Sequence, residues 1–314
     1  MNADDAEDPG GRAADGADLD DGPVERRGIE LVAAIALGLE AAKESGLLEV
    51  REGLVGQPPE LLGMEGALTQ RRQERANPLK DGAPPDVRTF LVPRSDYAID
   101  DTWYAVGLCG TGSKDVVVDD AFVPEYRTHS YRDAFYLTNP GAAVNDAPLY
   151  RLPFGLVFPA CISSPAIGVA LGALTTFRDQ TTTRISPRDQ SRVAEDPFVQ
   201  FSLAEAAAEV TAARDRLLGN FTEAMQLVRD GAELSLAQRA RYRWDTAKAA
   251  DRCVRAVDRL FEASGGRGVF LDNPIQRAWR DVHAIRAHAG NNLEKAAFVF
   301  GRSEFGLPPL DLRF

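Results

Sequence analysis

The pattern of hydrophobic and polar residues changes character along this chain, and each part predicts a different kind of structure. Short runs of apolar and β-branched residues lie between residues 87 and 123, separated by Asp, Gly and Pro. Such runs are typical of β-strands joined by tight loops. From about Pro159 onward, apolar residues recur every three or four positions, as in amphipathic helices. The pattern predicts an α+β fold, with a small antiparallel β unit followed by a helical bundle.

The β unit is expected to contain three strands, at residues 87–92, 103–108 and 116–123. The loop between the last two holds Gly110 and Gly112, and glycine allows a backbone to approach a ligand closely because it has no Cβ. Thr111 and Ser113 in the same loop either contact a ligand or stabilise the turn through their own hydroxyls.

Four long helices are predicted in the bundle. The first covers residues 162–177, and the second carries an apolar stripe over residues 203–228. A capping box of Ser235 and Gln238 opens the third, which Gly265-Gly266 ends, and Asn273-Pro274 starts a last helix running to residue 300. Short breaks between long amphipathic helices are typical of a four-helix bundle.

The first part of the chain contains no recognisable domain. Acidic residues far outnumber basic ones at its start, which predicts a disordered acidic tail over residues 1–26. We expect residues 27–85 to be partly helical or irregular. The remaining chain then divides into a β-domain remnant with a linker at 86–150 and a C-terminal helical bundle at 151–314.

Composition excludes several classes of function. A formal net charge of -11 argues against nonspecific nucleic-acid binding, which needs a basic surface. The 3 cysteines and 3 histidines lack metal-ligand spacing, so neither a metal site nor a disulfide framework is expected. We found no signal-peptide pattern and no sufficiently pure apolar run to span a bilayer, which predicts a soluble cytoplasmic protein.

Two motifs carry a resemblance to a known family. One is Gly-Thr-Gly-Ser-Lys-Asp at residues 110–115, followed by Phe-Val-Pro at 122–124, and the other is Gln-Arg-Ala-Trp-Arg-Asp-Val-His-Ala-Ile-Arg-Ala-His at 276–288. The first resembles a β-domain loop of flavin-dependent aromatic hydroxylases built on the acyl-CoA dehydrogenase fold. The resemblance covers about residues 86–314. It implies that the family's N-terminal helical domain is missing or altered in this chain.

Within that superfamily, the chain is most similar to the oxygenase components of two-component (group D) monooxygenases. The resemblance implies hydroxylation of a phenolic or other aromatic substrate, with O2 and with reduced FMN or FAD that diffuses from a separate flavin reductase. The subgroup acting on phenolic rings from steroid degradation is the most similar, and 4-hydroxyphenylacetate hydroxylases are related. The resemblance also implies a homotetramer.

The same resemblance assigns roles to individual residues. His288 stands where acyl-CoA dehydrogenases often place a catalytic glutamate, and its imidazole is implied to donate a proton or to help deprotonate a phenol. The implied cofactor-binding residues are Arg184, Thr111, Ser113, Gly265 and Gly266, and the implied substrate-binding residues are His283 and Asn291. Helix capping is an alternative role for Arg184 and the two glycines. Arg280 and Asp281 are expected to form an ion pair that holds the last helix.

Two other functions remain open from the sequence. An acyl-CoA dehydrogenase-like oxidoreductase fits the fold but lacks the glutamate near His288. A truncated, inactive bundle that serves only in oligomerisation would explain the unmatched residues 1–85, as would a shifted reading frame or a mis-called start. Cys109 also occupies a loop position where the family commonly has arginine.

Overall fold

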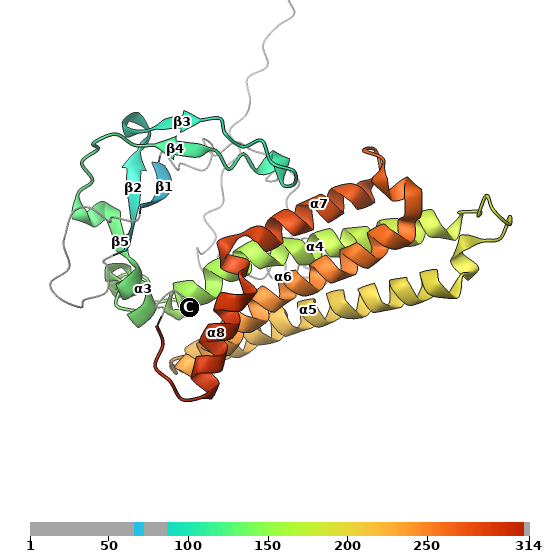
Figure 1. Ribbon diagram of the computed structural model, residues 1–314. Helices are drawn as coiled ribbons and strands as arrows, with labels where there is room; N and C mark the ends of the chain where they lie inside the picture. The colour runs from blue at the N-terminus through green and yellow to red at the C-terminus, as the bar shows by residue number, and fades with distance from the viewer. Residues whose placement is uncertain (1–65, 72–86, 311–314) are drawn as a thin grey trace, which may run out of the picture.

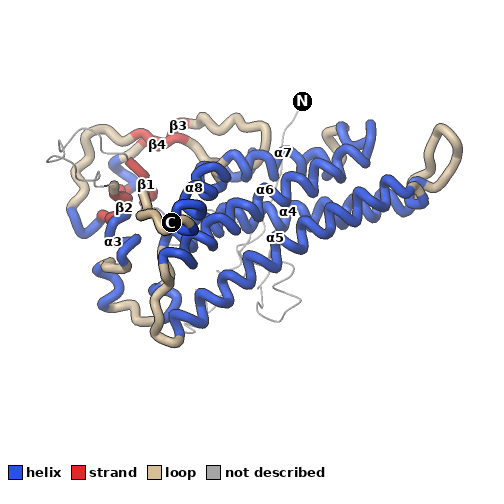
Figure 2. Tube along the Cα trace, turned by 60° about the horizontal axis from the view of Figure 1, so that its bottom comes forward, coloured by secondary structure: helices blue, strands red, loops and turns tan. Residues whose placement is uncertain are grey.

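The computed structural model describes residues 66–71 and 87–310 (Figure 1). The acidic tail predicted for residues 1–26 lies outside the described residues, as does the segment at 27–85 apart from one strand. In the described part, a small β unit lies at one end of an elongated helical bundle (Figures 1 and 2).

The β unit consists of two small antiparallel sheets. Strands β1 (Gly66–Arg71), β2 (Arg88–Pro93) and β5 (Thr128–Ser130) form one sheet in the order β1-β2-β5. Strands β3 (Ala98–Asp100) and β4 (Asp115–Val117) form the other, and helix α3 (Tyr131–Tyr136) follows β5. The strand predicted at residues 87–92 is confirmed as β2.

The strand predictions on either side of the glycine loop were less accurate. Residues 103–108 form no strand, and the strand predicted at 116–123 is confined to Asp115–Val117. The backbone of Val106 and Leu108 bonds to side chains of a helix, and these bonds replace a strand ladder. β-Propensity in this segment is therefore overridden by a tertiary contact.

The glycine loop attaches the β unit to the bundle. Arg280 donates from Nη1 to the carbonyl oxygen of Val106 at 2.7 Å, and the amide of Leu108 donates to Oδ1 of Asp281 at 2.7 Å. Leu108 adopts a left-handed conformation, with φ of 53°, to make this turn. Arg280 and Asp281 thus bind the loop, and the predicted ion pair between them was wrong. Figure 1 shows the loop reaching from β3 and β4 across to helix α7.

The bundle is formed by five helices. They are α4 (Phe154–Thr182), α5 (Pro197–Arg229), α6 (Leu236–Ser264), α7 (Pro274–Ala287) and α8 (Leu293–Glu304). Helix α6 is central, because it packs against each of the other four. The predicted start signals are confirmed: Ser235 and Gln238 form a complete capping box, and Asn273 caps α7.

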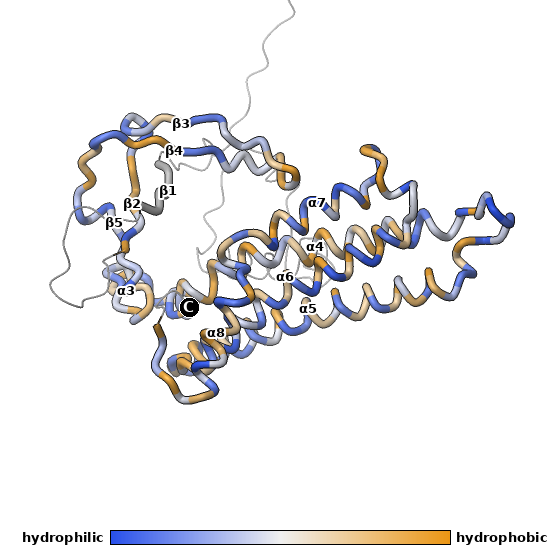
Figure 3. The backbone as a smooth tube through the Cα atoms, viewed as in Figure 1, coloured by the Kyte–Doolittle hydropathy of each residue, from blue (hydrophilic) through white to orange (hydrophobic). Residues whose placement is uncertain are grey.

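Small side chains on α6 allow its neighbours to approach closely. Ala240, Ala247, Ala250 and Ala256 are fully buried along this helix. Large residues from the neighbouring helices, such as Phe177 and Leu217, fill the remaining core. Figure 3 shows hydrophobic and hydrophilic residues alternating along α5 and α6, as expected for helices that bury one face.

The last predicted helix is two helices. Helix α7 ends at Ala287, residues 288–292 form a short turn, and α8 begins at Leu293. The buried side chain of Asn291 donates to the carbonyl oxygen of Ile285 at 2.8 Å, and Asn292 accepts from the amide of Lys295 at 2.8 Å. These bonds satisfy backbone groups at the two helix ends, so they stabilise a break where the apolar spacing alone indicated continuity.

Helix α4 is the one described helix whose length and composition would allow it to cross a membrane. It lies within the bundle, packed against α5, α6 and α7, and buries a row of residues from Leu156 to Thr181. A core helix passes the same test of length and composition. The feature is therefore weak evidence for membrane insertion.

We predict that Gly107→Ala destabilises the attachment of the β unit. A Cβ at Gly107 would lie 2.2 Å from the carbonyl oxygen of Arg280, so the loop must move away from α7. Overpacking of this kind costs about 1–3 kcal/mol, which urea unfolding would measure. Gly110→Ala is the matched control, because a Cβ there meets nothing within 4 Å and should change stability by less than about 0.5 kcal/mol. Equal effects of the two substitutions would contradict the role of the contact.

Candidate functional site

The turn after α7 presents the imidazole of His288. The backbone amide of His288 donates to the carbonyl oxygen of Ile285 at 3.2 Å, and the residue then leaves the helix with extended backbone angles. Its Nδ1 accepts a hydrogen bond from the amide of Gly290 at 2.9 Å. His288 is an exposed residue, so a bound molecule could reach its ring.

Aromatic side chains from the first turns of α4 lie beside this histidine. The ring centroid of Phe158 is 6.2 Å from that of His288, and Phe154 stacks on Phe158 at 5.2 Å. Tyr131 meets the edge of Phe154 at 5.9 Å. Sequence analysis missed this group because it placed the start of the helix after Pro159. The spacing of four between the two phenylalanines would have indicated a shared helical face.

The electrostatic environment favours the neutral form of His288. Packing against the protein lowers the pKa of its imidazole, and the positive charge of Arg243 on α6 lowers it further. Since the pKa lies below the ordinary value for histidine, the ring stays neutral at neutral pH and becomes charged only in more acidic solution.

The predicted cofactor residues Arg184, Gly265 and Gly266 lie at the opposite end of α7. Arg184 donates from Nη1 to the carbonyl oxygen of Ser264 at 2.9 Å, and Gly265 ends α6 with φ of 61°. Beside them is an open hollow of about 460 Å³. It is lined by Gln180, Thr181, Thr183, Arg184, Ser264, Arg267, Phe270, Asp272, Asn273 and Pro274. Two guanidinium groups and the N-terminus of α7 give this hollow the donors that a phosphate requires.

Thr111 and Ser113 are exposed in the loop that docks on the middle of α7. The hydroxyl of Thr111 donates to the carbonyl oxygen of Leu108 at 3.0 Å and lies 3.0 Å from that of Ser113. Their hydroxyls therefore already stabilise the turn, as the alternative reading of this loop predicted.

The two predicted substrate-binding residues have different surroundings. His283 shares Oδ1 of Asp258 with the indole of Trp279, at 2.9 Å and 2.7 Å respectively. Asn291 is fully buried, and its side chain accepts from Ser163 and donates to Ile285. The amide of Asn291 thus holds the turn that carries His288.

The residues selected from the sequence form three separate groups along α7. The 14-residue helix is about 21 Å long, and this length separates His288 from the hollow beside Arg184. The glycine loop contacts the helix between these two ends. A single copy of the chain therefore does not bring all the predicted residues to one place.

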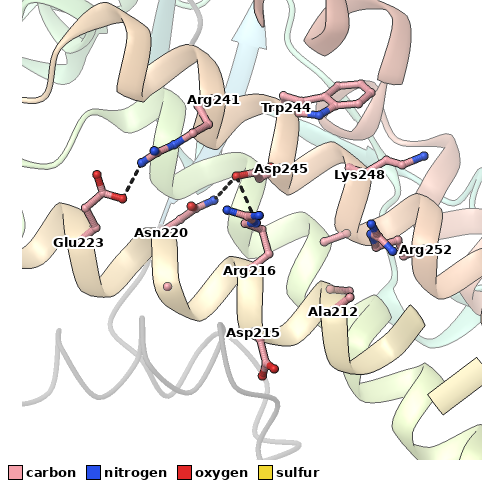
Figure 4. Close-up of a pocket in the computed structure, with 13 residues that line it drawn as sticks. Ala212, Asp215, Arg216, Asn220, Glu223, Arg241, Trp244, Asp245, Lys248 and Arg252 are labelled. Atoms are coloured by element: carbon pink, nitrogen blue, oxygen red, sulfur yellow. Dashed lines mark hydrogen bonds and ion pairs between the residues drawn. The ribbon is translucent and has the colours of Figure 1, made fainter. Parts of the chain in front are cut away.

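A larger hollow, of about 800 Å³, lies between α5 and α6 (Figure 4). Two ion pairs lie within it: Arg241 with Glu223, and Arg216 with Asp245. None of the predicted site residues lines it. No cluster of potential metal ligands occurs within residues 66–71 and 87–310.

Comparison with known proteins finds several that are similar to this chain. Residues 160–293 match the acyl-CoA dehydrogenase C-terminal domain. The chain is 44% identical over 234 residues to a flavin-dependent monooxygenase, oxygenase subunit HsaA, from Mycobacterium tuberculosis, covering 74% of this chain and 59% of the relative. It is 38% identical over 229 residues to the oxygenase component of an FADH2-dependent resorcinol hydroxylase from Rhizobium, covering 70% and 56%.

The solved structures agree with these sequence comparisons. The crystal structure of 3-HSA hydroxylase from Rhodococcus superposes with a TM-score of 0.71 and 41% identity, covering 75% of this chain and 61% of that one. The described part of the chain therefore has the acyl-CoA dehydrogenase fold, with a small antiparallel β unit and a helical bundle. More particularly, the chain is similar over about 74% of its length to the oxygenase subunit of a flavin-dependent monooxygenase. It spans about 59% of the length of the mycobacterial relative.

We predict that Arg243→Gln raises the pKa of His288. Removal of a nearby positive charge makes protonation of the imidazole less unfavourable. NMR titration of the histidine ring would measure the shift. Arg188→Gln, in the loop between α4 and α5, is the control and should leave the titration unchanged. An unchanged or lower pKa in the Arg243 variant would contradict the proposed influence of this charge.

Proposed function

We propose that this chain is the oxygenase component of a two-component monooxygenase that hydroxylates a phenolic substrate. O2 is the second substrate, and a separate flavin reductase supplies reduced FMN or FAD. The similarity to HsaA makes phenolic products of steroid degradation the first substrates to test. The observation that carries the proposal is the placement of His288 beside the stacked rings of Phe154 and Phe158.

The residues present fit a flavin and an aromatic substrate. When bound, reduced flavin activates O2, so that one oxygen atom enters the aromatic ring and the other leaves as water. Phe154 and Phe158 offer an apolar face against which a planar ring can stack and from which water is excluded. His288 can exchange or share a proton with an oxygen atom held there, because imidazole is neutral near physiological pH. Arg184 and Arg267 would hold the flavin phosphate.

We also propose that the working enzyme is a homotetramer in which neighbouring copies complete one site. In one copy, the proposed phosphate-binding residues and His288 are separated by the length of α7. A second copy could place its own phosphate-binding residues near His288 of the first. Val269, Phe270 and Leu271 are exposed between α6 and α7, where Figure 3 shows a hydrophobic tip. Apolar residues concentrated in this way are typical of subunit contacts. We place the enzyme in the cytoplasm.

The activity test combines the purified chain with a flavin reductase, NADH, FMN or FAD, and a panel of phenols. Under 18O2, the expected product carries one labelled oxygen atom on the aromatic ring. Reduction of bound flavin by an acyl-CoA would instead support an acyl-CoA dehydrogenase-like enzyme. Absence of flavin binding would support an inactive bundle. Either of these two results would overturn the proposed monooxygenase.

We expect His288→Ala to abolish productive hydroxylation while leaving the fold nearly unchanged, because His288 is an exposed residue outside the hydrophobic core. The measurement is the ratio of hydroxylated product to O2 consumed, together with the thermal unfolding midpoint. Arg188→Gln, in the exposed loop between α4 and α5, serves as the control, since this residue lies outside the proposed site. Equal coupling of O2 to product in the Ala variant and the wild type would remove His288 from the mechanism.

We expect Arg184→Gln to weaken binding of flavin by about tenfold or more, because a charge-assisted bond to a phosphate contributes about 1.5–3 kcal/mol. Fluorescence titration with oxidised FMN and FAD would measure the dissociation constants, and riboflavin tests the phosphate specifically. Arg192→Gln is the control, because it removes one exposed arginine from the following loop and should leave flavin affinity unchanged. If riboflavin and FMN lose affinity equally, Arg184 does not bind the phosphate.

A further inference from the structure

We propose that the backbone amide of Gly290 fixes His288 as one neutral tautomer, with its proton on Nε2. The histidine then acts as a hydrogen-bond donor toward the bound molecules, and it does not act as the base that deprotonates the phenol. Gly290 is thereby a positioning residue. This inference rests on the proposed function, because it specifies which of two roles His288 has in that site.

The direction of one hydrogen bond carries the argument. A backbone N–H can only donate, and the amide of Gly290 lies 2.9 Å from Nδ1 of His288. Nδ1 must therefore offer its lone pair, and in a neutral imidazole the proton then resides on Nε2. Protonation of Nδ1 would place two N–H groups against each other and would break this bond. To act as a base, the ring would have to accept a second proton. Nε2 already carries one proton, and the lone pair of Nδ1 is engaged by the Gly290 amide.

A side chain at position 290 would press on the imidazole ring. A Cβ there would lie 3.0 Å from Nδ1 and 3.4 Å from Cε1 of His288, closer than ordinary packing allows. The side chain of Asn291 anchors the same turn to Ile285 and Ser163 in the core. The amide of Gly290 is consequently held in place against the ring by a buried network.

The electrostatic environment supports the neutral form of the ring. Helices α4, α6 and α7 pack against the turn. Burial lowers the pKa of His288, and the positive charge of Arg243 on α6 lowers it further. The nearby guanidinium of Arg286 bonds to the carbonyl oxygen of Asn291. A neutral ring whose Nδ1 accepts from the Gly290 amide keeps its one proton on Nε2.

In this tautomer, the proton on Nε2 of His288 remains on the ring while it forms a hydrogen bond. Nε2–H donates to an oxygen atom of the activated oxidant or of the phenol, which stabilises negative charge on that atom without transferring the proton. Any proton that leaves the phenol must then be accepted by solvent or by another group. We therefore expect no acceptor role for His288 at the pH where the enzyme works.

NMR tests the tautomer directly in the full chain without flavin. The chain contains only 3 histidines, so ¹⁵N labelling of histidine gives few signals to assign. We expect a protonated Nε2 and an unprotonated Nδ1 at His288, with a scalar coupling between Nδ1 and the amide nitrogen of Gly290 across the hydrogen bond. A protonated Nδ1, or the absence of this coupling, would overturn the inference.

Substitution of the glycine provides a second measurement. Gly290→Ala forces the ring away from the amide, so we expect the coupling to weaken and the pKa of His288 to rise. Gly301→Ala in α8 is the matched control, because a Cβ there meets nothing within 4 Å. Equal coupling and equal titration in the two variants would show that the Gly290 amide does not hold the ring.

Two variants of His288 separate a donor from a base in the active enzyme. Glutamine places an N–H donor near the position of Nε2, whereas glutamate of similar shape offers an acceptor at neutral pH. We expect His288→Gln to form at least about tenfold more hydroxylated product per O2 consumed than His288→Glu. A more active Glu variant would overturn the donor role. If the wild type hydroxylates no phenol, the proposed function fails, while the NMR result still decides the tautomer.

Discussion

The arrangement of the described domains depends on the contact between the glycine loop and the middle of α7. Two adjacent residues of the helix, Arg280 and Asp281, bind a backbone carbonyl and a backbone amide of the loop, and Gly107 packs directly on the helix backbone. Close approach of two backbones excludes a Cβ, and the left-handed Leu108 is a strained conformation that the contact must offset. Together with the packing of α3 on α4 and the bond from Arg239 to the carbonyl oxygen of Phe135, this attachment positions the β unit on the bundle.

At the end of α7, the hydrogen bonds that stabilise the turn also expose the imidazole of His288. The buried side chain of Asn291 donates to the carbonyl oxygen of Ile285 in the last turn of α7. The chain therefore leaves the helix at His288, which begins a short turn. The first turns of α4 then place aromatic rings beside the imidazole. The turn is anchored in the core through Asn291, while His288 beside it is exposed to solvent.

The length of α7 separates the predicted site residues into distant groups. Arg184 and His288 lie near opposite ends of α7, so the residues proposed to bind the flavin phosphate and to act on the substrate are distant within one copy. In a homo-oligomer, residues that are distant within one chain can form one site at the interface between two subunits. The shared site that we propose would let these two distant regions act on the same bound molecules.

The sequence by itself determined the bundle helices that have regular apolar spacing and clear caps, including the starts at Ser235 and Asn273. These features depend on neighbours within one or two turns, which a local pattern records. The loop at residues 103–108, the break before α8 and the partners of His288 were decided only by the tertiary structure. In each case a backbone group is bonded by a residue distant in sequence or by a buried side chain, and such long-range hydrogen bonds can outweigh local preference without leaving a periodic signal.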